Sequence, residues 1–473
     1  MFTVGFDLDM TLIDSRPGVK AAMDGLSERM GVHIDTDLVI TRLGPPLERE
    51  LARWFPSWEI EAAAALYREL YGTTCLTGTT AMPGAHAAFE AVRAAGGKVI
   101  VVTAKSTPLA KLCLDTVGLH PDAIEGWLFS AGKGEALLEH GASIYVGDHI
   151  GDIEGAKFAN ALPVAVATGP IAADVLADAG ASVVLSSLEE FGPWLEHHLD
   201  NRARVAELEA RLRDLGSVAV AFSGGADSAF LLAAAVRALG SEQVVAVTAV
   251  SPSLADGELD QAAAFARDLG VRHETVTTDE LARDGYRANQ GDRCYHCKSE
   301  LLDTLLPVAR GHGMAHVLTG TNADDVAGGF RPGITAAAER GALTPLADAG
   351  LTKRAIRTVS KQWGLATWAK PAAACLSSRV AYGIEITPAR LARVDRAESA
   401  LRSALAGAGI PVQNLRVRDL GDVARVEIDA QFVPEVTGDL LAAVEGFSTV
   451  ELDPVGFRSG SMNELLADPE RYR

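Results

Sequence analysis

Cysteine is scarce in this 473-residue chain, and long apolar runs are missing. The five cysteines are an odd number, and only two of them lie close together, which excludes the dense, even framework of a disulfide-stapled secreted domain. No stretch approaches the roughly 20 apolar residues that a membrane span needs, and the N-terminus has no charged-then-apolar leader. We therefore expect a cytoplasmic protein with reduced thiols and no membrane partner.

Basic residues are also in short supply. The chain has 43 Lys and Arg against 62 Asp and Glu, a formal net charge of −19. Because proteins bind nucleic acid through Lys and Arg that displace counterions from the phosphates, this balance argues against a nucleic-acid partner. The length exceeds what one hydrophobic core usually serves, so we expect two or three domains.

Apolar strands alternate with amphipathic helical stretches in two parts of the chain, which is typical of parallel α/β sheets. We assign residues 1–195 to a first α/β domain with a helical insertion at about 16–80, and 196–215 to a helical linker. A second α/β domain is expected over 202–372. Residues 373–473, where LRVRDLGDVARVEIDA alternates with period two, predict a small α+β domain. The predicted fold class is α/β.

Groups suited to phosphoryl transfer follow successive strands of the first domain. Because the carboxyl ends of parallel strands meet at one edge of a sheet, we expect these groups to form one site. Any single Asp could instead cap a helix or turn, but an ordered set of several groups argues for a shared site. The set consists of Asp7, Asp9, Thr103, Lys133, Asp148 and Asp152.

This set resembles the four motifs of the haloacid dehalogenase (HAD) superfamily, and only Met10, where glycine is frequent, departs from them. The resemblance implies a Rossmannoid domain with a helical cap and a Mg²⁺-dependent phosphatase. Asp7 would attack phosphorus, and Asp9 would act as acid and then base. Thr103 and Lys133 would hold the phosphoryl oxygens. The resemblance places Mg²⁺ on Asp7, Asp148 and the backbone carbonyl of Asp9, with Asp152 supporting the metal or Lys133. An inert relic or a scaffold is the alternative.

The segment VAVAFSGGADSAFLLAAAV combines an apolar strand, a Ser-Gly-Gly turn and an apolar helix. Backbone N–H groups and a helix N-terminus can gather there around an anion, and the lysine of a GxxxxGKS loop is missing. The segment resembles the pyrophosphate loop (PP-loop) of enzymes that cleave ATP to form adenylates. This resemblance implies an ATP site formed by Ser223, Gly224, Gly225, Asp227 and Ser228, with Asn322, Asp324 and Asp325 on a facing strand end.

Further motifs, among them RCYHCK, GTNADD, GLTKRAIR, WAKPAAACLSSR and FRSGSMNE, resemble in order the LarE family of sulfurtransferases over about residues 202–466. That family uses ATP to thiolate the carboxylates of pyridinium-3,5-biscarboxylic acid mononucleotide, so the resemblance implies a small carboxylate substrate. Arg379, Arg416 and Arg418 could clamp its phosphate and carboxylates, or could form ordinary ion pairs. Glu427 is either a further substrate contact or their ion-pair partner.

Cys294 and Cys297 form the close pair, and Cys375 occupies the family's sulfur-donor position. In one branch of the family that cysteine gives up its own sulfur, and members of this branch lack the pair. The pair therefore resembles the other branch, in which three cysteines hold a [4Fe–4S] cluster that carries sulfide from an external donor. A zinc corner, a redox disulfide and two incidental thiols remain alternatives. Lys370 and Arg379 could favour the Cys375 thiolate if the fold brings them close.

The joined domains suggest one pathway, in which the phosphatase acts on a phosphate of the sulfurtransferase's substrate or product, or on AMP. Two other functions stay open for the second half. One is a transfer-RNA thiolase or another adenylating synthetase of the PP-loop class, and the other is a non-catalytic module that delivers a cluster or sulfur. Related sulfurtransferases assemble, so we expect a homo-oligomer.

Overall fold

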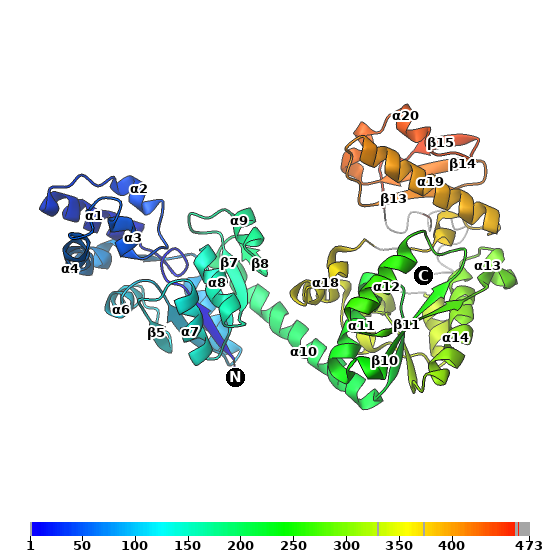
Figure 1. Cartoon of the computed structure of the whole chain (residues 1–473), viewed down its shortest axis with the longest axis horizontal. Coiled ribbons are helices and arrows are strands. Elements are labelled where there is room, and N and C mark those ends of the chain that lie inside the picture. The colour runs from blue at the N-terminus through cyan, green and yellow to red at the C-terminus, as the bar shows by residue number, and fades with distance from the viewer. Residues whose placement is uncertain (1, 329–330, 372–373, 459–461, 463–473) are drawn as a thin grey trace. The chain divides into compact units, whose positions relative to one another are not determined.

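The computed structural model describes residues 2–328, 331–371, 374–458 and 462 (Figure 1). It divides into two compact units, residues 1–200 and 201–473, and helix α10 (Phe191–Leu215) crosses the division. The boundary expected between residues 372 and 373 and most of the FRSGSMNE motif lie outside the described residues. Among the helices that are described, none is long and apolar enough to cross a bilayer.

The first unit is built on a six-stranded parallel sheet with the strand order β5-β4-β1-β6-β7-β8. Its strands are short apolar runs, because a parallel sheet is covered on both faces by helices. The strands are β1 (Thr3–Phe6), β4 (Lys98–Val102), β5 (Ala123–Glu125), β6 (Ala142–Gly147), β7 (Leu162–Val166) and β8 (Val183–Leu185). The helices that alternate with them are α5 (Ala85–Ala94), α6 (Thr107–Thr116), α7 (Ala131–Glu139), α8 (Ile150–Phe158) and α9 (Ala173–Asp178).

Four further helices of this unit form a cap (Figure 1). The two-stranded ribbon of β2 (Ile13–Asp14) and β3 (Thr80–Ala81) brackets them in the sequence. The cap helices are α1 (Arg16–Met30), α2 (Thr36–Ile40), α3 (Leu47–Leu51) and α4 (Ile60–Gly78), and they occupy the stretch in which the sequence predicts a helical insertion.

The second unit begins with a four-stranded parallel sheet in the order β11-β10-β9-β12. Its strands are β9 (Val218–Ala221), β10 (Val244–Val250), β11 (Arg272–Thr277) and β12 (His316–Thr319). Helix α11 (Ala226–Leu239) is apolar along almost its whole length and is therefore buried. The other helices are α12 (Glu258–Asp268), α13 (Asp284–Arg287), α14 (Arg293–Gly311), α15 (Ala323–Ala327), α16 (Pro332–Glu339), α17 (Pro345–Asp348) and α18 (Lys353–Gln362).

The C-terminal part of the second unit has its own small sheet and its own apolar core. Strand β13 (Leu415–Asp419) pairs antiparallel with β14 (Val423–Ile428), and β15 (Thr449–Leu452) lies parallel to β14. Helices α19 (Pro388–Gly407) and α20 (Gly438–Leu441) accompany this sheet (Figure 1). Two parallel α/β sheets and an α+β C-terminal part confirm the predicted fold class.

Candidate functional site

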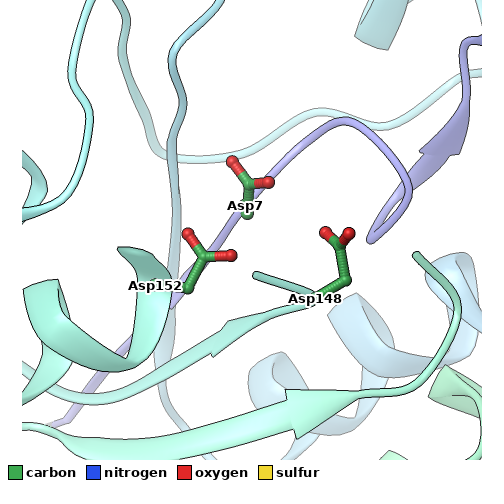
Figure 2. A group of neighbouring side chains, drawn as sticks. All are labelled: Asp7, Asp148 and Asp152. Atoms are coloured by element: carbon green, nitrogen blue, oxygen red, sulfur yellow. The ribbon is translucent and has the colours of Figure 1, made fainter. Parts of the chain in front are cut away.

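Three buried carboxylates meet at the carboxyl edge of the first sheet. Asp7 directly follows β1, Asp148 follows β6, and Asp152 lies in the first turn of α8. Their carboxyl groups project from neighbouring elements toward the same region (Figure 2), and one oxygen from each lies within 4.8 Å of the others. Among the residues that the structure describes, no other three His, Cys, Asp or Glu side chains meet this closely.

The charge of this cluster is not balanced by the protein. The Lys133 ammonium donates to Asp7 Oδ1 at 2.7 Å and to Asp152 Oδ1 at 2.6 Å, and the Thr11 hydroxyl donates to Asp148 Oδ1 at 2.8 Å. Burial raises the pKa of Asp7 to about 7 despite the Lys133 charge. Burial, reinforced by the charges of Asp7 and Asp152, also raises the pKa of Asp148 well above its usual range. The excess negative charge and the all-oxygen donor set fit a divalent cation such as Mg²⁺.

Two glycines let the backbone come close to these carboxylates. A Cβ atom at Gly169 would lie 1.8 Å from Asp148 Oδ2, and one at Gly147 would lie 2.3 Å from the Asp152 carboxyl carbon. Side chains at either position would push a carboxylate out of the cluster, so the site depends on glycine there.

Asp9 and Thr103 lie beside the cluster but outside the group of three carboxylates. Thr103 is buried at the end of β4, and its Oγ1 accepts the Lys105 backbone N–H at 3.2 Å. The Lys105 ammonium pairs with Asp9 Oδ1 at 3.2 Å and lies 4.1 Å from the centre of the Tyr71 ring in α4. The sequence analysis missed Lys105, whose only signal was its place two residues after Thr103. The structure also explains why the resembled HAD motif often has glycine where this chain has Met10. Met10 has a left-handed φ of +62°, which favours glycine and which the sequence alone could not show.

In the second unit, the SGGADS turn forms a compact loop between β9 and α11. Gly224 takes a left-handed φ of +67°, and the Ser223 and Ser228 hydroxyls lie 3.1 Å apart. Lys370 donates to Gly224 O at 3.1 Å and to Glu258 Oε2 at 2.7 Å. The loop thus carries a cation that the motif itself does not contain, and Lys370 also lines a cavity with Cys375.

A cavity of about 440 Å³ lies over this loop. Of the predicted ATP-site residues, Ser223, Gly225, Asp227, Ser228 and Asp325 line it. Four basic side chains also line it, which suits a polyphosphate; they are Lys298, Lys353, Arg357 and Lys370.

The predicted ATP-site residues that follow β12 divide into two groups by their contacts. Asn322 and Asp325 form a capping box at the start of α15, while the Asp324 carboxylate accepts the Lys353 backbone N–H at 2.7 Å and so caps α18. Burial raises the pKa of Asp227, and the nearby charge of Asp325 raises it further. Asp227 and Asp325 therefore form an acidic pair at the cavity that suits Mg²⁺, while Asp324 holds α18 in place.

The three cysteines gather at the start of α14. Cys294 and Cys297 lie in the first two turns of this helix, and Cys375 directly precedes the short helix η5 (Leu376–Arg379). Cys297 packs against an apolar cluster that includes Leu376, and Cys297 and Cys375 line the same cavity of about 660 Å³. All are free thiols, with Cys294 and Cys375 exposed. Their sulfur atoms are not grouped closely enough for a single zinc ion, whereas a cluster spreads its cysteines over several iron atoms.

Two residues that the sequence analysis missed tie this helix to the Cys375 loop. Arg293 donates to Asn289 Oδ1 at 2.6 Å and to the Ser377 carbonyl at 2.9 Å. Asn289 is fully buried in a left-handed conformation, and its amide donates to backbone carbonyls in the loop after η5, including Ala381 O at 2.8 Å. Burial lowers the pKa of Arg293, but its net pKa is raised by neighbouring groups, Cys375 and Cys294 first among them. Arg293 therefore lies within electrostatic reach of these two cysteines.

The predicted substrate arginines are held by acidic partners. Arg379 forms a two-point ion pair with Glu398 at 2.9 and 3.0 Å and donates to the Cys375 carbonyl at 3.0 Å. Arg418 donates twice to Glu427 Oε2, at 3.0 and 2.7 Å, so Glu427 is an ion-pair partner.

Arg416 lies across the strand pair from Glu427 and, with Arg379, lines the 660 Å³ cavity. Burial lowers the pKa of Arg416 to about 10, and the charge of Arg379 adds to this effect. Arg379 is paired with Glu398 on the same wall, so Arg416 is the arginine whose charge an anionic substrate group would stabilise most.

Comparison with known proteins gives two family matches, haloacid dehalogenase-like hydrolase over residues 4–157 and asparagine synthase over residues 205–419. An uncharacterised protein of Synechocystis is 42% identical over 271 residues, which cover 56% of this chain and 98% of that protein. The pyridinium-3,5-bisthiocarboxylic acid mononucleotide synthase of Lactiplantibacillus plantarum is 38% identical over 271 residues, covering 55% of this chain and 94% of that enzyme.

The first unit has relatives of its own kind. The phosphoglycolate phosphatase of Rhodospirillum rubrum is 28% identical over 215 residues, covering 40% of this chain and 89% of that enzyme. The chain therefore belongs to the family of the pyridinium-3,5-bisthiocarboxylic acid mononucleotide synthase, and it carries in addition a HAD-like phosphatase domain.

Proposed function

We propose that the second unit catalyses ATP-dependent sulfur transfer and converts a carboxylate of a small nucleotide-like acid into a thiocarboxylate. The observation that carries this proposal is the continuity of the two cavities. The 440 Å³ cavity over the PP-loop and the 660 Å³ cavity beside the cysteines share lining residues, which are Ser223, Ala249, Leu254, Leu301, Lys370 and Pro371. A substrate activated at the nucleotide end can therefore meet sulfur without leaving the protein.

The first step activates the carboxylate. A substrate carboxylate oxygen attacks the α-phosphorus of ATP, the bond to the β-phosphate bridge oxygen breaks, and pyrophosphate leaves. The N–H groups of the Gly224–Gly225 turn, the Lys370 ammonium and Mg²⁺ near Asp227 and Asp325 would stabilise the departing charge. The product is an acyl adenylate, whose AMP group leaves readily.

The second step forms the carbon–sulfur bond. Sulfide attacks the acyl carbon, the carbon–oxygen bond to AMP breaks, and the thiocarboxylate and AMP are released. We propose that Cys294, Cys297 and Cys375 hold a [4Fe–4S] cluster, which supplies the sulfide when it is present. The residues fit this group because three free thiols supply the type of donor that iron–sulfur clusters take.

Two observations support a proposed substrate: the name of the Lactiplantibacillus plantarum relative and the residues that line the 660 Å³ cavity. That relative makes a pyridinium mononucleotide, which combines a phosphate, carboxylates and a cationic ring. Arg379 and Arg416 suit the anionic groups, whereas Glu258 and Glu280 on the same cavity suit a cationic ring. We therefore propose pyridinium-3,5-biscarboxylic acid mononucleotide, or an acid of the same charge pattern, as the substrate.

ATP–pyrophosphate exchange tests the first step. We expect exchange of labelled pyrophosphate into ATP only when the carboxylate substrate is present, and we expect Lys370→Met to suppress it. Lys361→Met is the matched control, because Lys361 lies on the surface of α18 over Trp368. Exchange absent with every candidate acid, in a protein that binds a cluster, would instead indicate a cluster-delivery module.

For the first unit we propose Mg²⁺-dependent hydrolysis of a phosphate monoester. Asp7 would attack phosphorus while the ester bond to the leaving oxygen breaks, and Asp9 would give that oxygen a proton. Lys133 and the Thr103 hydroxyl would hold the phosphoryl oxygens. Mg²⁺ on Asp7 and Asp148, with support from Asp152, would offset the negative charge of the phosphoryl group. Water activated by Asp9 would then release phosphate from Asp7.

Phosphate release from a panel of monoesters tests this second activity. We expect hydrolysis that needs Mg²⁺ and that Asp7→Asn abolishes. Equal inactivity of the wild type and Asp7→Asn toward every ester, and toward acetyl phosphate as an activated small substrate, would show that the domain is a relic or scaffold.

A further inference from the structure

The cavity between the cap and the sheet of the first unit is small. It lies on the cap side of Asp9 and Lys105, where the leaving group of a phosphate ester would be, and its volume is about 120 Å³. Tyr67, Tyr71 and Trp127 contribute to its wall. An engineered protein cavity of about 150 Å³ holds benzene, a molecule of about six heavy atoms, whereas a nucleoside has about three times as many.

The charges around this cavity balance one another. Lys105 pairs with Asp9 at 3.2 Å, and Arg42 pairs with Glu50 at 2.5 Å. Arg68 forms an ion pair with Glu48 across the cap. With each cation matched by a carboxylate, the cavity has no net charge to attract a second phosphate or a highly charged leaving group.

The cap is held against the sheet domain at two places beside this cavity. The Arg68 guanidinium of α4 lies 4.6 Å from the centre of the Trp127 ring, and the Arg49 guanidinium of α3 lies 5.2 Å from the centre of the Phe129 ring. Both aromatic rings belong to the loop between β5 and α7, so these contacts join the cap to the sheet domain next to the cavity.

From the volume and the balanced charge, we propose that the phosphatase site takes phosphate monoesters of compact alcohols of about six heavy atoms or fewer. It excludes AMP and pyridine mononucleotides. This inference rests on the proposed phosphatase function, and it separates the first unit's substrate from the nucleotides that the second unit handles. The phosphatase would then act on a small metabolite and not on the sulfurtransferase's substrate, product or AMP.

Steady-state kinetics of the full chain test this inference. The substrates are glycerol 3-phosphate, 2-phosphoglycolate, AMP and nicotinate mononucleotide, all with Mg²⁺. We expect kcat/KM for the better of the two small esters to exceed that for either nucleotide by at least about 100-fold, because a bulky group meets the closed wall. Comparable rates with AMP or nicotinate mononucleotide would overturn the inference while leaving the phosphatase function intact. Inactivity toward all four esters and acetyl phosphate would instead overturn the phosphatase function.

Variants that enlarge the cavity add a second test. Trp127→Ala removes an exposed ring at the mouth, and Leu43→Ala removes a half-buried side chain from the wall. We expect both to raise the ratio of nucleotide to small-ester kcat/KM by roughly tenfold. Trp58→Ala is the matched control, because Trp58 belongs to the cap, is 81% exposed and does not line the cavity. An unchanged ratio in both enlarged variants would contradict the proposed steric selection.

Discussion

The two reactive clusters of this chain are built in opposite ways. The carboxylates of the first unit are buried and lie around a single lysine. Burial and the neighbouring carboxylates raise the pKa values of Asp7 and Asp148. Two of the three cysteines of the second unit are exposed, and neighbouring residues fix their backbone rather than their sulfur atoms. The first site is an all-oxygen donor set whose charge suits a divalent cation, whereas Cys297 and Cys375 of the second site line a large cavity. We therefore expect metal binding in the first site to depend on the carboxylates themselves, and sulfur transfer in the second to depend on the contacts that position the cysteines.

The largest expected effect separates the two activities. Asp7→Asn removes the proposed nucleophile, so we expect phosphatase turnover to fall by roughly 10⁴-fold while sulfur transfer stays unchanged. Parallel assays of phosphate release and thiocarboxylate formation provide the measurement, with the exposed Asp174→Asn of the same unit as control. A simultaneous loss of sulfur transfer would show that the sites do not act independently.

Removal of one cysteine should separate the adenylation step from the step that forms the thiocarboxylate. Adenylation needs only the cavity over the PP-loop, so we expect Cys375→Ser to keep ATP–pyrophosphate exchange. We expect its rate of thiocarboxylate formation to fall by more than about 100-fold. Bound iron and sulfide, measured in anaerobically purified protein, should fall as well. Tyr295→Phe is the control within α14, since its hydroxyl donates to Glu339. Full product formation by Cys375→Ser would count against a sulfur role for this thiol.

A smaller effect is expected where the scaffold itself is changed. Arg293→Gln removes the donors that join Asn289 to the Ser377 carbonyl, so we expect sulfur transfer to fall by about 10–100-fold. The cluster's absorption spectrum should shift in parallel, which a general loss of stability would not produce. Arg310→Gln, in the last turn of the same helix, serves as control. An unaltered spectrum and rate would mean that this contact does not position the cysteines.

The smallest predicted effect is on stability and concerns the carboxylates. The pKa of Asp7 rises from 3.8 to about 7 in the folded chain, so without a cation its contribution to stability is lost as the pH rises through this range. We therefore expect the melting temperature of the first unit in EDTA to fall between pH 4 and about 7. Mg²⁺ should restore it most strongly at high pH, because binding must displace a proton. Thermal unfolding with and without Mg²⁺ measures this, and equal Mg²⁺ stabilisation at pH 5 and pH 8 would contradict it.

The sequence indicated the candidate residues of each site better than the contacts that support them. Strand order and the carboxyl-edge rule sufficed to bring Asp7, Asp148 and Lys133 together, because these residues lie next to regular strands and helices. Lys105 and Arg293 escaped notice because their roles depend on contacts with residues far along the chain, Tyr71 in one case and Ser377 in the other. No local pattern encodes such contacts.

The same limit applies to the partners of two predicted residues. Lys370 lies five positions before Cys375, yet its ammonium turns to the PP-loop, because Gly224 O and Glu258 offer it two acceptors there. Asp324 follows the motif but caps α18, since a carboxylate beside an open helix start finds backbone N–H groups. Sequence spacing indicates which side chains are available, but their partners are decided by tertiary packing.

Isotope tracing of the transferred sulfur tests the central claim most directly. The full chain, purified anaerobically, is incubated with ATP, Mg²⁺, isotopically labelled sulfide and pyridinium-3,5-biscarboxylic acid mononucleotide, and both product and intact protein are weighed by mass spectrometry. We expect labelled thiocarboxylate in excess over protein chains, with the mass of the polypeptide unchanged. Unlabelled product limited to one per chain, together with loss of a sulfur atom from Cys375, would contradict it.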